Sequence, residues 1–206
     1  MKAIFVTKTL TIAVAVACAA LRLNAADGWV TYKAQPGSTV TMDGTSSVHD
    51  WTVIGQAIGG TMELDPAFDA DLKTVKETPK VSIIIPVRQL KSQVKAGAAK
   101  MDQVMQEHMN MKEHPRIEYK LLKLTPKDGK LEAEGALTVS GVTKTNVMTV
   151  KFDRVEGSKI KVSGQTTIKM TDHGIKPPAP QILGMPTIST GDEVKIAFEW
   201  VTAKAQ

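Results

Sequence analysis

A cluster of methionines with one histidine contains the residue types best suited to metal binding in this sequence. It comprises Met101, Met105, His108, Met109 and Met111. Thioether and imidazole ligands suit Cu(I), and spacings of three and four residues place the first four side chains on one face of a helix. The same face could instead pack over an apolar opening, where flexible methionines fill irregular gaps. We favour the packing interpretation and expect no metal site, with copper binding as the alternative.

Two neighbouring His–Asp pairs resemble halves of a catalytic pair. They are His49-Asp50, which follows the hydroxyls of Ser46-Ser47, and Asp172-His173. Adjacent side chains of an extended chain point to opposite faces, so neither pair is preformed for proton relay. The chain also lacks a G-x-S-x-G elbow and an H-E-x-x-H motif. We therefore expect a protein that is not an enzyme and needs no cofactor, and a hydrolase is the least favoured alternative.

The amino-terminal region has the pattern of a removable export signal. Basic residues precede an apolar run at 10–21, and residues 23–25 form a suitable cleavage site. The run is too short to span a bilayer, which takes about 20 residues. We expect a signal peptide at 1–25 and a single mature domain at 26–206 without a membrane-spanning segment. The mature protein would then be periplasmic or secreted.

The single cysteine and the net charge narrow the classes of partner. Cys18 lies inside the expected signal, so the mature chain would have neither a disulfide nor a thiolate metal site. Residues 15–18 resemble a lipoprotein processing site without its usual Leu, which makes lipidation of Cys18 the less favoured alternative. Removal of Lys2, Lys8 and Arg22 lowers the formal net charge from +5 to +2. This small positive balance argues against a nucleic-acid partner.

Alternating apolar and polar residues dominate the chain beyond Trp29, as is typical of strands with one buried face. Short turn signals such as Pro36-Gly37 separate the runs, so most neighbours should pair antiparallel. Strands do not alternate regularly with helices, which excludes a parallel α/β sheet and leaves a sandwich or a closed barrel. We expect eight or nine strands, at about 29–34, 38–48, 51–64, 80–87, 116–124, 130–139, 145–153, 159–170 and 192–201.

Two segments depart from this alternation. Residues from Ala96 to Glu113 have helical periodicity, and the helix should end at His114-Pro115 because a residue before proline avoids the helical region. One helix between strands is expected to cap the end of a barrel. The proline-rich stretch at 176–180 cannot continue a strand ladder. We expect a stiff loop there, either as a lip of a pocket or as a shield over a sheet edge.

Several motifs, in the same order and spacing, resemble the YceI-like family of bacterial periplasmic lipid-binding proteins. The similarity extends from about Trp29 to Thr202. The stretch at 135–144, G-A-L-T-V-S-G-V-T-K, is similar to the family's G-x-L-T-x-x-G-V-T-K hairpin. The other similar segments are 44–51 (G-T-S-S-V-H-D-W), 81–87 (V-S-I-I-I-P-V) with 90–92, 101–102, 114–117 and 169–178.

The resemblance implies an all-β fold, an extended lipocalin-like antiparallel β-barrel of about eight strands with one inserted capping helix. It also implies a long apolar pocket for a polyisoprenoid, a quinone-type tail or another long-chain amphiphilic lipid. No catalytic set comes with the family. Its barrels can pair, which leaves a homodimer open.

Inward-facing residues of the strands, together with the methionine face of the helix, should line such a pocket. Aromatic residues are only 4% of the chain, and small inward residues fill less of a barrel, which leaves room for an alkyl chain. We expect Trp51 to contact a polar head group and the helix or the proline-rich loop to control entry. The candidate lining residues are Trp51, Ile83, Ile85, Val87, Met105, Met109, Leu137, Val139, Met148, Val150, Phe152, Ile168, Ile196 and Phe198.

Overall fold

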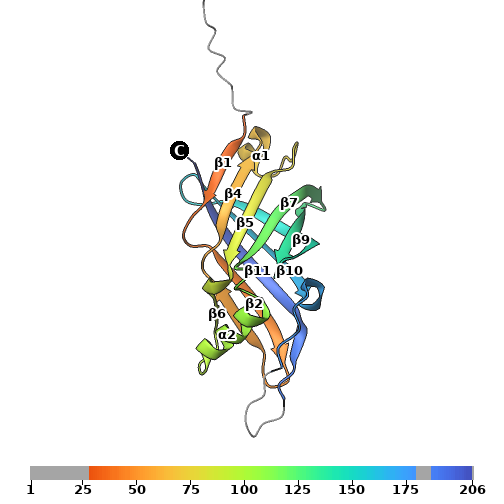
Figure 1. The fold of residues 1–206 in the computed structure, drawn as a ribbon. Helices are drawn as coiled ribbons and strands as arrows, with labels where there is room; N and C mark the ends of the chain where they lie inside the picture. Colours follow the sequence, from red (N-terminus) through yellow and green to blue (C-terminus); the bar gives the residue numbers. More distant parts are fainter. Residues whose placement is uncertain (1–27, 180–186, 206) are drawn as a thin grey trace, which may run out of the picture.

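The computed structural model describes residues 28–179 and 187–205, so the expected signal peptide and Cys18 lie outside the described residues. In the described part, eleven strands form one sheet (Figure 1). The strands are β1 (Val30–Ala34), β2 (Thr39–Ser46), β3 (Trp51–Gly55), β4 (Gly59–Leu64), β5 (Lys80–Pro86), β6 (Leu90–Ser92), β7 (Arg116–Lys127), β8 (Lys130–Val139), β9 (Val142–Arg154), β10 (Lys159–Lys169) and β11 (Thr190–Lys204).

Eight of the strands close into a ring, which confirms the expected antiparallel barrel. The order around the ring is β1, β4, β5, β7, β8, β9, β10 and β11, and β1 pairs with β11 to close it. The amino-terminal part of β11 pairs instead with β2, which continues through β3 to β6. The long β11 therefore joins the closed barrel to a three-strand extension below it in Figure 1.

The expected strand at 51–64 is two strands that belong to different parts of the sheet. β3 pairs with β2 and β6 in the extension, whereas β4 pairs with β1 and β5 in the barrel. The chain crosses between them at 56–58. Gly60, at φ 137°, lies so close to the backbone of Ser82 that a Cβ atom would overlap it. Apolar residues continue through the crossing, so periodicity alone does not show the change of partner.

Helix α2 (Ala98–His108) lies within the expected helical segment and beside β6 (Figure 1). Asp102 attaches it to the sheet, because its Oδ1 accepts the Ser92 N–H at 2.7 Å and its Oδ2 is 3.2 Å from Lys91 Nζ. The helix buries none of its own residues. Turns follow it from Met109 until β7 begins after Pro115.

A second, shorter helix was missed in the sequence. Helix α1 (Pro66–Asp71) closes the other end of the barrel (Figure 1). Asp65 caps it by accepting the Ala67 and Phe68 N–H groups at 2.9 and 3.3 Å, and proline follows at the first helical position. This Asp-Pro start is a recognised helix signal, but the helix is too short to show periodicity.

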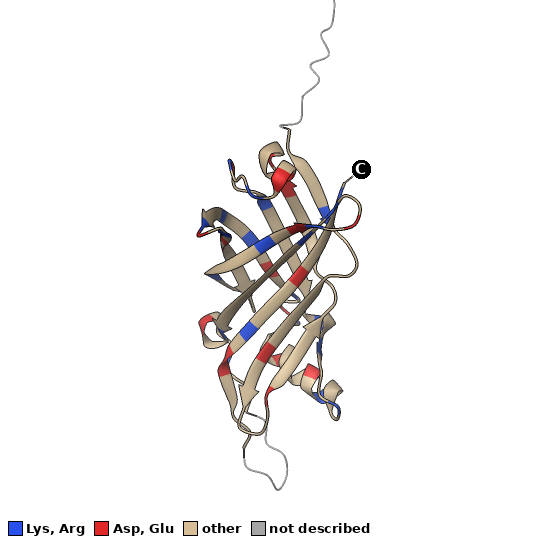
Figure 2. Ribbon diagram, turned by 180° about the vertical axis from the view of Figure 1, so that it is seen from behind, with Lys and Arg blue, Asp and Glu red and all other residues tan. Residues whose placement is uncertain are grey.

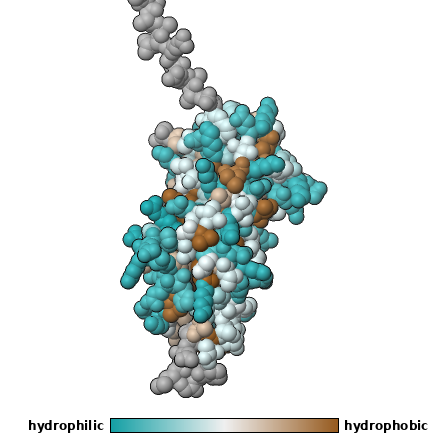
Figure 3. All heavy atoms as spheres, turned by 45° about the vertical axis from the view of Figure 1, so that its right-hand side comes forward, coloured by the Kyte–Doolittle hydropathy of each residue, from teal (hydrophilic) through white to brown (hydrophobic). Residues whose placement is uncertain are grey.

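The outer surface of the barrel is polar and carries both signs of charge. Figure 2 shows Lys, Arg, Asp and Glu interspersed along the strands, with no strip of a single sign. Figure 3 shows residues of hydrophilic and intermediate hydropathy over most of the visible face, with small apolar patches between them. No helix in the described ranges has both the length and the apolar character needed to cross a membrane.

Candidate functional site

The barrel encloses an apolar cavity of about 550 Å³. Its wall follows from the pleat of the strands, because side chains two residues apart point to the same face. Val81, Ile83 and Ile85 of β5 show this periodicity, and the inward residues of β7 to β11 follow the same rule. Ligand pockets typically have volumes of about 300–1,000 Å³, so a small molecule or an alkyl chain has room inside.

The structure brings nearly all of the predicted lining residues onto the wall of this cavity. Val87 is the exception. It lies in a 3-10 turn, η1 (Val87–Gln89), where it is fully buried away from the cavity. The chain leaves β5 at Pro86, so the two-residue periodicity ends one step before Val87. Those on the wall are Trp51, Ile83, Ile85, Met105, Met109, Leu137, Val139, Met148, Val150, Phe152, Ile168, Ile196 and Phe198.

Sequence reasoning missed several residues that also line the cavity. Val40 and Met42 on β2 follow the same alternation as the predicted residues, so periodicity could have identified them. Met170 and His173 lie in and beside a 3-10 turn, η2 (Thr171–His173), and had no such signal. Tyr119 is also on the wall, although its strand was predicted correctly.

Glycines allow large side chains to lie flat on the wall and keep the interior open. A Cβ atom at Gly44 would overlap the indole ring of Trp51 on the neighbouring strand. The Trp51 Nε1–H donates to the Thr45 carbonyl at 3.1 Å. Its nitrogen is thus already paired, and the ring contributes mainly apolar area at the cavity wall. Contact between Trp51 and a lipid head group stays a prediction.

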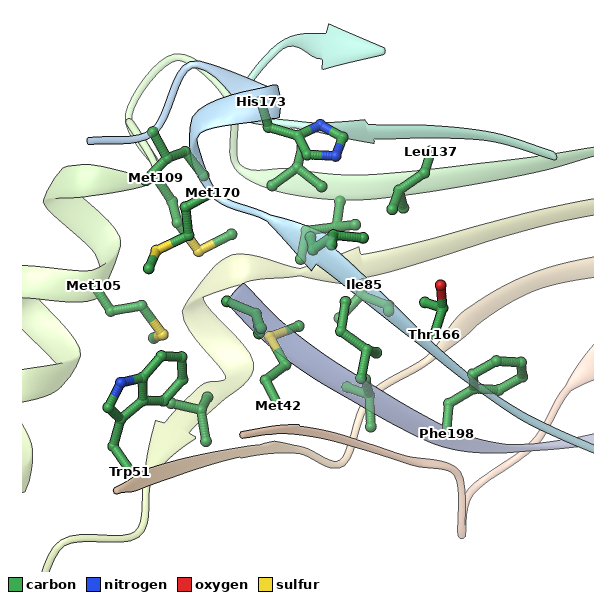
Figure 4. Close-up of a pocket in the computed structure, with 18 of the residues that line it drawn as sticks. Met42, Trp51, Ile85, Met105, Met109, Leu137, Thr166, Met170, His173 and Phe198 are labelled. Atoms are coloured by element: carbon green, nitrogen blue, oxygen red, sulfur yellow. The ribbon is translucent and has the colours of Figure 1, made fainter. Parts of the chain in front are cut away.

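The cavity opens at the α2 end of the barrel. Its lining there includes two exposed apolar side chains, Val48 at 54% and Met101 at 36% exposure. Figure 4 shows methionine side chains from β2, from α2 and its C-cap, and from the residue before η2 gathered near Trp51. Phe198 and Thr166 lie farther along the barrel in the same view. The methionines at this opening are Met42, Met105, Met109 and Met170.

The proline-rich segment is joined to α2 at the same opening. The His108 Nδ1–H donates to the Lys176 carbonyl at 2.8 Å, and Pro178 belongs to the cavity wall. Pro180 lies outside the described residues. The helix and residues 176–179 therefore form adjoining parts of the rim.

The candidate catalytic residues make separate local contacts. His49 Nδ1 donates to the Asp50 carbonyl at 2.7 Å, and Ser46 Oγ donates to the His49 carbonyl at 2.6 Å. His173 is buried, and its Nδ1 donates to the Val142 carbonyl at 3.0 Å. These bonds organise turns, and no carboxylate belongs to the described lining residues.

The described part of the chain brings no cluster of hard or borderline metal ligands together. Within residues 28–179 and 187–205, no group of three or more His, Cys, Asp or Glu side chains is placed to hold a metal ion. Met101, Met105, His108 and Met109 do share the cavity side of α2, as their spacing predicted. His108 already uses one ring nitrogen in its bond to the backbone.

Comparisons with known proteins agree with this architecture. The model of the YceI-like domain matches residues 32–202. No curated protein gives a significant sequence match.

Solved structures share the fold at low sequence identity. BcnA of Burkholderia cenocepacia aligns with a TM-score of 0.61 and 18% identity, covering 80% of this chain and 95% of BcnA. A polyisoprenoid-binding domain from Saccharophagus degradans gives 0.62 and 12%, covering 85% and 99%. The YceI protein of Campylobacter jejuni gives 0.56 and 20%, covering 75% and 84%. With its family model matched over most of its length, the chain belongs to the YceI-like domain family.

Proposed function

We propose that this protein binds a polyisoprenoid, a quinone-type tail or another long-chain amphiphilic lipid inside the barrel and performs no covalent chemistry. The observation that carries the proposal is the apolar cavity, which is enclosed by the strands and open at the α2 end. Burial of an apolar tail contributes about 25 cal/mol per Å² removed from water. The Saccharophagus degradans structure with the same fold is described as a polyisoprenoid-binding domain, which also supports this class of ligand.

In this proposal the tail enters between α2 and residues 176–179. Met105 and Met109 are flexible and polarizable, so they can adapt to tails of different shape. Helix α2 buries no residue of its own, and Asp102 links it to β6. A helix that lies at the rim without a buried residue suits a controlled entrance.

We also propose that the chain is exported and acts as a single-domain carrier in the periplasm or outside the cell. The basic and apolar pattern of residues 1–25 supports export. A homodimer is compatible with this role. Size-exclusion chromatography with light scattering of the mature protein, residues 26–206, would measure its oligomeric state.

Blocking the cavity tests the proposed function most simply. Val150 faces the cavity, whereas Val147 on the same strand faces solvent with 52% exposure. Val150→Trp should abolish binding of a fluorescent polyprenyl probe, and Val147→Trp should leave binding unchanged. Circular dichroism would establish that both variants are folded. Equal binding by both folded variants would contradict an internal lipid site.

A second pair of changes separates lipid binding from copper binding. Leu137→Phe adds volume inside the cavity and provides a milder block than Val150→Trp if the latter fails to fold. Replacing both Met105 and Met109 by Leu nearly preserves volume and apolarity but removes two thioethers. The double variant should retain probe binding. The metal alternative would instead be supported by two results together: wild-type protein binds Cu(I) stoichiometrically but no lipid, and the double variant loses the Cu(I) binding.

A further inference from the structure

A small polar group interrupts the apolar wall of the barrel. It consists of Tyr119 on β7, Asn146 on β9 and Thr166 on β10. Tyr119 and Thr166 belong to the cavity wall. Asn146 is in the same inward phase of β9 as Met148 and Val150. Three strands thus bring hydrogen-bonding side chains to one side of an otherwise apolar interior.

Gly135 on β8 allows these side chains to approach one another. It pairs with Asn146 across the β8–β9 ladder, and a Cβ atom at Gly135 would overlap the hydroxyl end of the Tyr119 ring. The phenol therefore extends over β8 toward the strand that carries Asn146. Asn146 Nδ2 donates to Thr166 Oγ1 at 3.0 Å.

Two of the polar atoms in this group are buried without a partner. Neither Tyr119 Oη nor Asn146 Oδ1 makes a hydrogen bond to any described residue. Burying such a group without a partner costs about 1–3 kcal/mol. One atom is a hydroxyl donor and the other is a carbonyl acceptor. Burial raises the pKa of Tyr119 to about 12, and the nearby Glu134 adds to the effect, so the phenol keeps its proton at neutral pH.

We propose that Tyr119 and Asn146 hold the neutral hydroxyl of an isoprenoid alcohol or quinol-type lipid inside the barrel. A hydroxyl oxygen can accept the Tyr119 proton while its own proton is donated to Asn146 Oδ1. This assignment rests on the proposed function and adds the chemistry of the head group to it. It places that group within the barrel rather than at Trp51.

The charges around the cavity favour a neutral head group at this position. The lysine and histidine side chains of the lining are Lys100 and His108 on α2, His49 beside β3 and His173 in η2. All four lie on elements at the open end or in turns that adjoin it. Glu134, whose charge already raises the pKa of Tyr119, would also oppose an anion there. A phosphate head group would therefore be poorly stabilised beside Tyr119.

The chain offers a matched pair of tyrosines for the test, because Tyr32 and Tyr119 are its only two. Tyr32 Oη donates to Asp69 Oδ1 at 2.7 Å and is not part of the cavity wall. Binding of geranylgeraniol, its corresponding hydrocarbon and geranylgeranyl phosphate would be measured by calorimetry for wild type, Tyr119→Phe and Tyr32→Phe. Asn146→Leu would repeat the test from the acceptor side.

The proposal expects Tyr119→Phe and Asn146→Leu each to weaken geranylgeraniol binding roughly tenfold, the loss of one hydrogen bond. Hydrocarbon binding should not change, and Tyr32→Phe should affect neither ligand. Equal affinities of wild type and Tyr119→Phe for the alcohol would overturn the proposal and indicate a bound water instead. Equal weakening for the alcohol and the hydrocarbon would overturn it too, as a packing effect. Absence of wild-type binding to all three probes would refute the proposed function itself.

Discussion

The two ends of the barrel differ in how they are filled. At the α1 end, Phe68 inserts into the barrel and meets Phe152 edge to face, with ring centroids 5.1 Å apart. Phe68 and Trp200 are fully buried there. At the α2 end the helix buries none of its own residues, and Val48 and Met101 remain exposed on the rim.

The α1 end is also held by more polar side-chain contacts than the α2 helix makes with the sheet. At the α1 end Asp69 accepts the Tyr32 hydroxyl and is 3.1 Å from the Arg154 guanidinium. These contacts tie α1 to β1 and β9. At the α2 end the ion pair between Lys91 and Asp102 is largely exposed on its lysine side. The comparison indicates that one end supplies stability while the other preserves access to the cavity.

The largest expected difference between the ends concerns apolar truncation. Phe68→Ala should lower the free energy of unfolding by about 3–5 kcal/mol, because it leaves a cavity in a well-packed region. Met101→Ala at the opening should change it by no more than about 0.5 kcal/mol. Urea unfolding of both variants would measure the contrast. Similar losses at the two sites would show that the open end is as firmly packed as the closed end.

The two tyrosines give a smaller but more specific contrast. Tyr32→Phe removes a hydrogen bond to a carboxylate and should cost about 1.5–3 kcal/mol of unfolding free energy. Tyr119→Phe removes a buried hydroxyl without a described partner, so the ligand-free protein should lose nothing or become slightly more stable. Thermal unfolding of delipidated protein would provide the measurement. A large destabilisation by Tyr119→Phe would indicate that its hydroxyl is already paired in the ligand-free protein.

Alkaline unfolding should distinguish Tyr119 through its titration. Its pKa is raised from 10.0 to about 12 by burial and by Glu134, so the folded state holds its proton more tightly than the unfolded state. This ionisation leaves stability unaffected below pH 10 and lowers it as pH rises from 10 toward 12, because burial disfavours the phenolate in the folded state. The stability of Tyr119→Phe should therefore fall less steeply over this range than that of wild type. Parallel pH profiles would contradict this ionisation behaviour.

The smallest expected effect is an acid-sensitive turn after α1. Hydrogen bonds from Thr74 and from the Lys73 N–H lower the pKa of Asp71 from 3.8 to about 2. A lowered folded-state pKa gives stabilisation that is present above pH 4 and disappears as pH falls toward 2. Asp71→Ala should slightly flatten the acid side of the stability profile. An unchanged acid profile would show that this exposed turn does not contribute measurably.

Much of the barrel could be predicted because its strands alternate regularly. Alternation in β8, β9 and β11 identified both the strands and the inward side chains. Alternation did not reveal the change of partner between Gly55 and Gly59, because β3 before it and β4 after it both bury apolar residues. It also failed at Val87, where a turn replaces the strand.

The polar group inside the cavity was invisible to the same reasoning. A tyrosine, an asparagine and a threonine on three strands have no fixed sequence spacing, and only the register of β7 to β10 brings them together. Gly135 was noted as part of a family-like motif, but its role beside Tyr119 depends on contacts across the ladder. Apolar walls follow from periodicity, whereas polar contacts between strands require the three-dimensional register.

Native mass spectrometry of the exported protein, purified without delipidation, would test the central claim most directly. The account predicts one lipid adduct per chain, which solvent extraction should release as an isoprenoid or another long-chain lipid. Val150→Trp should be recovered without the adduct, while Val147→Trp should retain it. A bare polypeptide that gains no mass from added isoprenoid alcohols, quinones or other long-chain lipids would contradict lipid binding by this barrel.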